Sequence, residues 1–495
     1  MRVVTDGHSV ALWSTRAPSE PEPTPWKLLL LITLLAVVLR AIGLDSGLWY
    51  DEIRTLQDSV RSPLGRILTV FPGDNQHTFF SLLAHGSIAV FGDHPWSLRL
   101  PSMLLGSLTV PVLFFFAREF VGRTEALLAS LLLAVSYHHV WFSQSARGYA
   151  ALALLTVLST WLLLRGLRRR QTSDFILYAI AAALGIYTHV TMVFLVASHA
   201  LLCVLPLGLP FVHPDWRRRW TLPLAGFVLA GVFAGLLYSP VLLDVNQFVV
   251  KRASPMRGAT PGWALMELIK GLEIGFGGVV AVIVGAALFA AGAWRYLKQS
   301  RFLLGLFLLP GVITVAAAVA LHRPVRPRFV LFLAGFALLV VVRGALEIGR
   351  RLQAGRPNGD DSVTTPGIAL VAAMAVLSLV SLRVNYAYPK QDFAGALAFV
   401  ESRNGAGDPV LTAGPATYPY QSYFQRPWTG IASQAALDSA RARGRPVWVL
   451  YTLASYIEHD SPDLMKTLTT GCSVREVFRG TVGGGDVTVC LLPSR

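Results

Sequence analysis

The sequence predicts an α-helical polytopic membrane protein with about eleven transmembrane helices and a small extracytoplasmic α/β domain at its C-terminus. Of its 495 residues, 54% are hydrophobic and only 14% are charged, which excludes an ordinary soluble protein. The apolar residues also fall into blocks near the ~20 residues that a helix needs to cross the hydrocarbon layer. The blocks are residues 28–44, 98–117, 126–141, 150–164, 175–187, 190–209, 222–243, 274–294, 302–321, 329–342 and 368–382.

The N-terminal leader, residues 1–25, is polar and rich in proline, which predicts a disordered cytoplasmic segment. The block at 28–44 follows it without a small-residue cleavage site, so we interpret this block as a retained helix rather than a signal peptide. Residues 26–384 then form the predicted transmembrane module, and residues 385–495 form the extracytoplasmic domain.

The net charge of +15 suggests a nucleic-acid partner, but the basic residues lie in short loops at regular intervals. They occupy every second loop, which the positive-inside rule places in the cytoplasm. The N-terminus is therefore predicted to be cytoplasmic and the C-terminal domain extracytoplasmic, in a multi-pass protein of the cytoplasmic membrane. The predicted partners of the protein therefore include membrane lipids and no nucleic acid. The basic loops contain Arg118 and Arg123, residues 165–170, 217–219, 295–301 and 343–356.

Three outer segments are long enough to carry function: the first loop at 45–97, the loop at 244–273 and the C-terminal tail. In the first loop, Asp51–Val60 and Thr78–Phe91 mix apolar and polar residues at helical spacing, without turn residues. This pattern predicts amphipathic helices on the membrane surface.

The tail alternates helix-like and strand-like segments, which predicts a small α/β module. The run Gly483-Gly484-Gly485 precedes a strand, so we expect a hairpin turn rather than a phosphate loop. A disulfide between Cys472 and Cys490 is permitted here, and the sequence leaves it open, whereas Cys203 is a small core residue. Helices are expected at 392–403 and 433–443, and strands at 409–412, 447–451 and 487–492.

Two adjacent carboxylates, Asp51 and Glu52, follow the first span and precede Arg54. Ionisable groups near hydrocarbon are costly, so they are functional candidates. Neighbouring side chains on a helix point about 100° apart, so one carboxylate can face a cavity while the other caps the helix or holds Arg54. The alternative is an interfacial helix with a solvated acidic first turn.

Arginines also lie at predicted outer ends, against the positive-inside trend. An anionic ligand explains them, since guanidinium matches phosphate in bidentate geometry. The alternative is snorkelling to lipid headgroups, which is favoured for Lys251, Arg252 and Arg257. The candidate phosphate ligands are Arg99, Arg147, Arg326 and Arg328.

His77 and His189 fall at outer ends as well, either as functional groups or as hydrogen-bonded interfacial histidines. The sequence has no zinc-ligand spacing and no serine or cysteine triad signature, so we predict no metal and no cofactor. Outward carboxylates with outward arginines fit an enzyme that binds an anionic lipid head and activates an acceptor hydroxyl. They also fit a carrier of such a lipid.

Several short motifs follow one another at these outer ends. They are Leu39-Arg40 with Gly43-Leu44 and Trp49-Tyr50-Asp51-Glu52, Phe91-Gly92-Asp93 with Trp96 to Ser102, Ser143 to Ala150, Tyr187-Thr188-His189, and Arg326 to Phe329. In this order they resemble the C-type (GT-C) polyprenyl-phosphate-sugar glycosyltransferases, the superfamily of protein O-mannosyltransferases and the lipid A aminoarabinose transferase. The resemblance covers the first half of the chain closely and the remainder loosely.

The resemblance implies transfer of one sugar from an undecaprenyl- or dolichyl-type phosphate to a lipid, glycan or protein acceptor on the outer face. In such enzymes an acidic residue of the first loop is catalytic, which would fall on Asp51, with Glu52 beside it. Arg54 matches an arginine that follows the acidic pair in some members. The outer arginines are expected to bind the donor phosphate, and His77, Tyr149 and His189 are the candidate substrate-binding residues.

Two departures from the family pattern affect these expectations. The family often has His-Pro-Pro where this chain has Asn75 to Phe80, and a glutamate where Ser145 stands. The second change leaves Arg147 without an obvious neighbour and frees it for phosphate.

Our hypothesis is that Asp51 is the general base and that Arg147 and Arg328 stabilise the departing phosphate. A single base with in-line displacement inverts the anomeric centre, whereas retention needs a second carboxylate as nucleophile. The competing hypothesis is a transporter of the lipid-linked sugar, which would require charges or helix breaks near mid-membrane.

Overall fold

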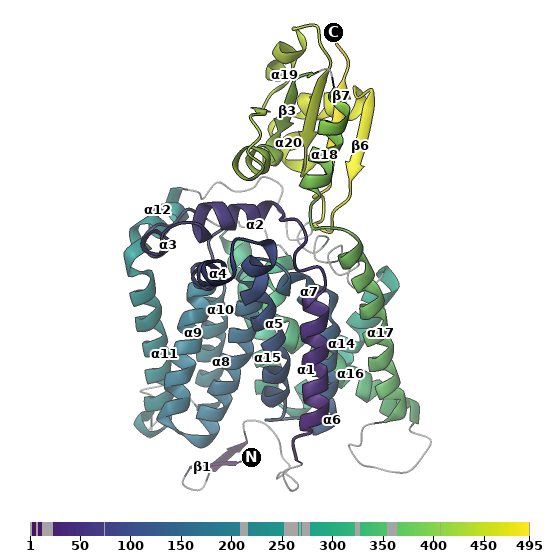
Figure 1. The fold of residues 1–495 in the computed structure, drawn as a ribbon. Coiled ribbons are helices and arrows are strands. Elements are labelled where there is room, and N and C mark those ends of the chain that lie inside the picture. Colours follow the sequence, from purple (N-terminus) through teal and green to yellow (C-terminus); the bar gives the residue numbers. More distant parts are fainter. Residues whose placement is uncertain are drawn as a thin grey trace. The chain divides into compact units, whose positions relative to one another are not determined.

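The computed structural model describes residues 2–5, 8–11, 23–73, 75–207, 216–251, 266, 269, 278–321, 327–353, 364–405 and 407–494 (Figure 1). The chain divides into two compact units. The first, called here the helical unit, comprises Met1–Ile42, Leu64–Ser87 and Arg99–Leu382. The second, called the mixed unit, comprises Gly43–Pro63, Ile88–Leu98 and Arg383–Arg495.

Each of the predicted apolar blocks coincides with helix in the structure. The corresponding elements are α1 (Trp26–Ala41), α5 (Pro95–Ala117), α6 (Arg123–Val135) with α7 (Tyr137–Ser143), α8 (Tyr149–Arg169), α9 (Thr172–Thr188), α10 (Met192–Leu207), α11 (Trp216–Tyr238), α14 (Val279–Gln299), α15 (Arg301–Ala320), η4 (Leu331–Leu333) with α16 (Ala334–Gln353), and α17 (Thr365–Ala387). The short helices α3 (Leu64–Thr69), α4 (Thr78–Phe91) and α12 (Leu242–Lys251) lie in the predicted loops.

Among the described residues, seven helices are long and apolar enough to cross a membrane, and the bent pair α6–α7 is an eighth if it counts as one span. Helices α1, α9 and α10 have 16, 17 and 16 residues, below the ~20 that a full crossing of the hydrocarbon layer needs. A multi-span membrane protein is therefore confirmed, while the number eleven stays a prediction.

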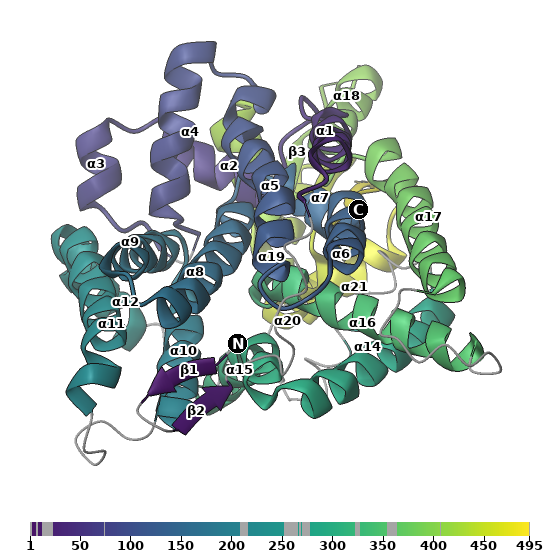
Figure 2. The same ribbon diagram turned by 90° about the horizontal axis from the view of Figure 1, so that it is seen from below.

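Close packing in the helical unit uses small residues. Helix α9 lies between α8 and α11, and α14 packs on α16 (Figure 2). A Cβ atom added to Gly292 of α14 or to Gly344 of α16 would lie 1.8 Å from a carbonyl oxygen of the opposite helix. Glycine is thus required for these two backbones to meet, as is common between helices in lipid.

The span predicted at 126–141 is broken, because α6 and α7 meet at an angle of 57°. The break frees carbonyl groups at the C-terminal end of α6, and hydrocarbon offers no water to satisfy them. Arg40 of α1 donates hydrogen bonds to the carbonyls of Leu133 and Ala134, at 3.2 and 3.0 Å. Ser378 of α17 donates to the next carbonyl, that of Val135, at 2.8 Å.

The same region closes the end of α1. Gln144, directly after α7, donates from its amide nitrogen to the carbonyls of Leu39, Arg40 and Ile42, at 3.3, 3.2 and 2.6 Å. Arg40 is fully buried and also contacts Nδ1 of His139 at 2.7 Å. Helix α1 and the α6–α7 pair therefore satisfy each other's backbone ends.

We expect Arg40→Met to destabilise the protein by about 3 kcal/mol, because it leaves buried carbonyls without their charged donor. The apparent melting temperature in detergent measures this, with Arg383→Met at an exposed position of α17 as the control. An unchanged melting temperature for Arg40→Met would show that the break is stable without this guanidinium.

In the mixed unit, the predicted helix at Asp51–Val60 appears as α2 (Tyr50–Thr55) continued by a π-helical turn, η1 (Leu56–Val60). Helix α4 has the predicted bounds, and its last residues belong to this unit.

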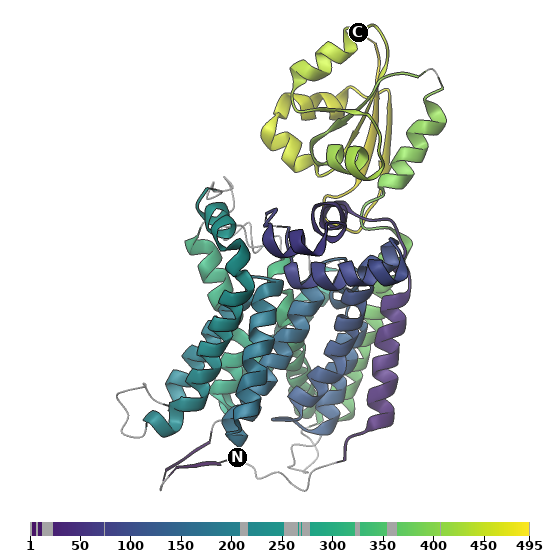
Figure 3. The ribbon, with the colours of Figure 1, turned by 60° about the vertical axis from the view of Figure 1, so that its left-hand side comes forward.

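The tail forms a five-stranded sheet in the order β4-β3-β5-β7-β6. Strand β3 (Val410–Ala413) runs parallel to β4 (Thr429–Ile431) and β5 (Val447–Tyr451), whereas β7 (Val487–Leu492) is antiparallel to β5 and to β6 (Val474–Phe478). Helix α18 (Phe393–Arg403) covers one face, and α19 (Gln434–Arg441), α20 (Ala454–Asp460) and α21 (Pro462–Thr470) cover the other (Figure 3).

The α/β module is therefore confirmed, with its predicted strands and helices within a few residues. Strands β4 and β6, which are the two edge strands of the sheet, were not predicted from the sequence. Strand β4 has only three residues, and β6 contains charged side chains, so neither shows the pattern of a buried strand. Gly483–Gly485 lies in the connection between antiparallel β6 and β7, as expected for a hairpin turn. Cys472 and Cys490 form a disulfide.

Two other predicted segments are only partly described. In the leader, β1 (Arg2–Thr5) and β2 (His8–Ala11) pair as an antiparallel ribbon, where the sequence predicted no regular structure. The β-branched valines of both strands favour extended backbone. Most of the loop predicted at 244–273 lies outside the described residues, as do Arg252 and Arg257.

Candidate functional site

The adjacent carboxylates of α2 have different surroundings. Glu52 is fully buried, and its Oε2 accepts a hydrogen bond from the backbone N–H of Trp49 at 3.3 Å. It therefore caps the start of the helix, where the macrodipole favours a negative charge. Asp51 is half-buried, and its backbone carbonyl accepts from the hydroxyl of Thr55. Of the two acids, Asp51 is the more accessible to a substrate.

Arg54 of the same helix has a carboxylate partner within one turn. Its Nε lies 3.0 Å from Oδ2 of Asp58. The i, i+4 spacing brings these two side chains to one side of the helix.

In the helical unit, five of the predicted residues come together as one group, which we call the aromatic–guanidinium cluster. The rings of His77, Tyr149 and His189 lie against one another, with centroid distances of 5.1, 5.3 and 5.8 Å. The guanidinium of Arg147 lies 5.7 Å from the centre of the Tyr149 ring. Arg328 joins through Phe329, whose ring is 5.8 Å from that of His189.

The charge of the cluster resides on its arginines. Burial, followed by the charge of Arg147, holds the pKa of His77 well below its usual range. Burial and the charges of Arg147 and Arg328 lower the pKa of His189 to about 3. Both imidazoles are therefore neutral at physiological pH, so they can donate or accept a hydrogen bond without adding charge.

Short-range contacts fix the positions of these side chains. Nδ1 of His77 lies 3.0 Å from the carbonyl oxygen of Thr188, which is next to His189. Nη1 of Arg147 donates to the backbone oxygen of Asn75 at 2.8 Å and also to its side-chain oxygen. The expectation that Arg147 lacks a neighbour was therefore wrong: Asn75, in the segment that departs from the family pattern, is its partner.

The remaining predicted phosphate ligands are Arg99 and Arg326. Arg99 is fully buried in the first turns of α5. Arg326 lies outside the described residues, although Arg328 and Phe329 of the same motif belong to η3 (Pro327–Phe329). No group of three or more His, Cys, Asp or Glu side chains in the described segments could hold a metal ion.

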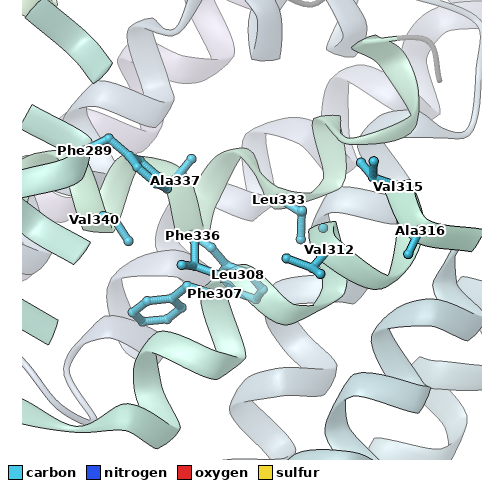
Figure 4. Close-up of a pocket in the computed structure, with 11 residues that line it drawn as sticks. Phe289, Phe307, Leu308, Val312, Val315, Ala316, Leu333, Phe336, Ala337 and Val340 are labelled. Carbon is cyan, nitrogen blue, oxygen red and sulfur yellow. The ribbon is translucent and has the colours of Figure 1, made fainter. Parts of the chain in front are cut away.

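An apolar pocket of about 590 Å³ opens in the helical unit between α14, α15 and α16 (Figure 4). Aliphatic and phenylalanine side chains line it, including Phe307, Val312, Leu333 and Phe336. Leu333 is in the short helix η4, which follows η3 and Arg328 directly along the chain. The pocket has the chemistry of a site for a hydrocarbon chain and was not predicted, because its residues are indistinguishable from other apolar residues in the sequence.

We expect Gly148→Ala to disrupt the cluster. A Cβ atom at this position would lie 2.7 Å from Cγ2 of Thr188 and 2.9 Å from Nδ1 of His77, so the imidazole must move. The sequence predicts that these residues bind a polyprenyl-phosphate donor, so binding of polyprenyl phosphate should weaken about tenfold or more, as measured by titration in detergent. Gly231→Ala in α11 is the matched control, because no atom lies within 4 Å of its added Cβ. Equal binding by both variants would contradict the assignment of the cluster.

Comparison with known proteins gives a family for part of the chain. Residues 77–243, which contain most of the cluster, match the model of the family described as dolichyl-phosphate-mannose-protein mannosyltransferase. A stretch of 116 residues is 26% identical to "Putative mannosyltransferase YkcB" of Bacillus subtilis (strain 168). This stretch is 23% of this chain and 16% of that protein, so the match spans only a small part of the relative.

Solved structures share the fold over nearly the whole chain. ArnT from Cupriavidus metallidurans in the apo state has a TM-score of 0.55 at 14% identity, over 94% of this chain and 98% of that chain. The same protein bound to undecaprenyl phosphate has a TM-score of 0.53, with the same identity and coverage. The Archaeoglobus fulgidus oligosaccharyltransferase in complex with Zn and sulfate has a TM-score of 0.52 at 13% identity, over 93% of this chain and 72% of that chain.

The family match covers the three middle motifs, from Phe91 to His189, and the shared fold extends over both units. These findings confirm the resemblance drawn from the sequence: the chain has the fold of ArnT, and its residues 77–243 match the dolichyl-phosphate-mannose-protein mannosyltransferase family.

Proposed function

We propose that this protein is a membrane glycosyltransferase that moves a sugar from a polyprenyl-phosphate carrier to an acceptor hydroxyl on the outer face of the cytoplasmic membrane. The observation that carries the proposal is the aromatic–guanidinium cluster, where Arg147 and Arg328 accompany two neutral histidines and Tyr149. Two guanidiniums suit a phosphate, and neutral imidazole and phenol groups suit sugar hydroxyls.

The apolar pocket supports a lipid-linked donor. A prenyl chain gains about 0.8 kcal/mol for each methylene that it buries. With its phosphate at Arg328 and its chain toward Leu333, a donor would use the two features in the order in which they follow along the chain. The related fold of ArnT has been solved with undecaprenyl phosphate, which agrees with this donor class.

Asp51 is the general base in this proposal. A hydroxyl is a poor nucleophile near neutral pH, and a carboxylate within hydrogen-bond reach removes its proton as the bond to the sugar forms. The polyprenyl phosphate leaves with the electron pair of the glycosidic bond, and the arginines stabilise its charge. One displacement of this kind inverts the anomeric centre.

The remaining predicted residues keep supporting roles. Glu52 holds the start of α2 through the N–H of Trp49, so it orders the helix on which Asp51 lies. Arg99 and Arg326 stay predicted phosphate ligands, whereas the ion pair of Arg54 with Asp58 favours a structural role for Arg54 over the predicted one. The disulfide between Cys472 and Cys490 supports an extracytoplasmic C-terminal domain, because disulfides persist in oxidising compartments.

The transporter hypothesis requires a helix break, and α6 and α7 form one. The backbone groups at this break are, however, hydrogen-bonded within the protein. Transporters use the unsatisfied backbone groups of broken helices to hold their ions. Here the freed carbonyls accept hydrogen bonds from Arg40 and Ser378, which favours a structural role for the break.

We expect Asp51→Asn to lower kcat by about 10²–10⁴-fold, because the amide cannot accept the proton. The assay follows radiolabelled sugar from a panel of polyprenyl-phosphate sugars into crude membranes as acceptor. Asp460→Asn, in α20 of the C-terminal domain, is the control for the chemical change. Full activity of Asp51→Asn would remove the base from the mechanism, and retention of anomeric configuration would remove the single displacement.

We expect Val312→Trp to raise the KM for a long-chain donor about tenfold, because the indole fills the apolar pocket. Val312 is 60% exposed, so the larger side chain causes no clash in the core. A short-chain donor should be transferred as by the wild type, and so should both donors by Val376→Trp on the exposed surface of α17. An equal effect on short and long donors would place the prenyl chain elsewhere.

A further inference from the structure

One side of the helical segment α2–η1 is packed on the C-terminal domain inside the mixed unit. The side chains in contact are Tyr50, Arg54, Gln57, Asp58 and Arg61, which recur at helical spacing and form one stripe. Asp51, the proposed base, lies directly beside this stripe, about 100° around the helix from Tyr50. Its direction therefore depends on how the stripe is held.

Asp58 is the central residue of the stripe. Its Oδ1 accepts a hydrogen bond from the hydroxyl of Tyr418, and its Oδ2 pairs with Nε of Arg54 at 3.0 Å. The guanidinium of Arg54 also lies 5.9 Å from the centre of the Tyr418 ring. The Arg54 and Asp58 side chains are only 28% and 23% exposed, so solvent screens this pair less than a surface ion pair. We call these three side chains the clamp.

One contact before the clamp and one within it prevent the helix from pivoting on it. Gln391 accepts from the backbone N–H of Tyr50 at 2.9 Å and donates to the hydroxyl of Thr452 at 3.0 Å. One turn after the clamp begins, Gln57 donates to the carbonyl of Ser422 at 3.0 Å. The first N–H group of a helix has no partner inside the helix, so the Gln391 contact also satisfies a group that the fold would otherwise leave open.

The protonation states suit a permanent contact. Burial, followed by the hydrogen bond with Asp58, raises the pKa of the Tyr418 hydroxyl, so it stays a donor at any physiological pH. Burial likewise raises the pKa of Tyr50.

We propose that the C-terminal domain is a positioning module for the catalytic helix, in which Tyr418, through Asp58 and Arg54, holds α2 so that Asp51 keeps one orientation. The inference rests on the proposed function of Asp51 and assigns Tyr418, Asp58 and Arg54 as positioning residues. It explains why a helix from the first loop and a domain from the end of the chain form one compact unit. A base displaced by about 1 Å can lose 10²-fold in rate, so a polar clamp on its helix has a direct effect on catalysis.

The first test is the kinetics of Tyr418→Phe, which keeps the ring over Arg54 and removes only the hydroxyl. We expect kcat to fall about tenfold or more while the KM for the donor changes less than about twofold, since the donor ligands lie in the helical unit. Tyr388→Phe, at a tyrosine that is 42% exposed in the same unit, should behave as wild type. Asp58→Asn should act like Tyr418→Phe, and the double variant should lose little more than either. An unchanged kcat for Tyr418→Phe would overturn the proposal.

The second test is amide hydrogen exchange, which does not depend on activity. Exchange in residues 50–60 should be faster in Tyr418→Phe than in wild type, while the sheet of the C-terminal domain keeps its protection. Unchanged exchange in α2 would also overturn the proposal. If the wild type transfers no sugar from any donor, the proposed function fails, and faster exchange would still establish the clamp itself.

Discussion

A guanidinium buried among helix ends is the interaction on which the helical unit depends. Arg40 occupies the place where α6 stops and α7 turns away, and it donates to carbonyls that lipid could not satisfy. Gln144 likewise donates hydrogen bonds to the carbonyl groups at the end of α1. Burying such a charge is costly by itself. The cost is offset here because several buried oxygen and nitrogen acceptors surround the guanidinium of Arg40.

The break also decides where the next segment runs. Helix α7 is short, and the chain after it passes through Gln144 to Arg147 before α8 begins at Tyr149. The side chains that follow the break are therefore brought to His77 and His189, which come from other loops. Gly148 permits the close approach, since any larger residue would meet His77. The stability of the bundle and the geometry of the cluster thus have a common origin in how backbone groups are satisfied.

In the mixed unit, neighbouring carboxylates have different roles. Glu52 is buried and caps the start of α2, whereas Asp51 is accessible to a substrate, although the two residues are adjacent on one helix. Asp58 serves the C-terminal domain rather than a substrate. Three carboxylates within eight residues therefore have three different tasks, which differ in burial and in hydrogen-bond partners.

The sequence by itself determined the class of fold, the apolar blocks and most elements of the C-terminal domain, because hydrophobic blocks and periodicity report burial directly. Its motifs and the predicted outer ends of its spans also identified five residues that the structure brings together in the cluster. Only the tertiary structure decided that Asn75 is the partner of Arg147, that Arg40 closes a break between α6 and α7, and that Tyr418 reaches Asp58. These contacts join residues dozens to hundreds of positions apart through one or two hydrogen bonds each. Such contacts leave no periodic trace in a sequence, because one polar side chain looks the same whether its partner is water, lipid or a distant helix.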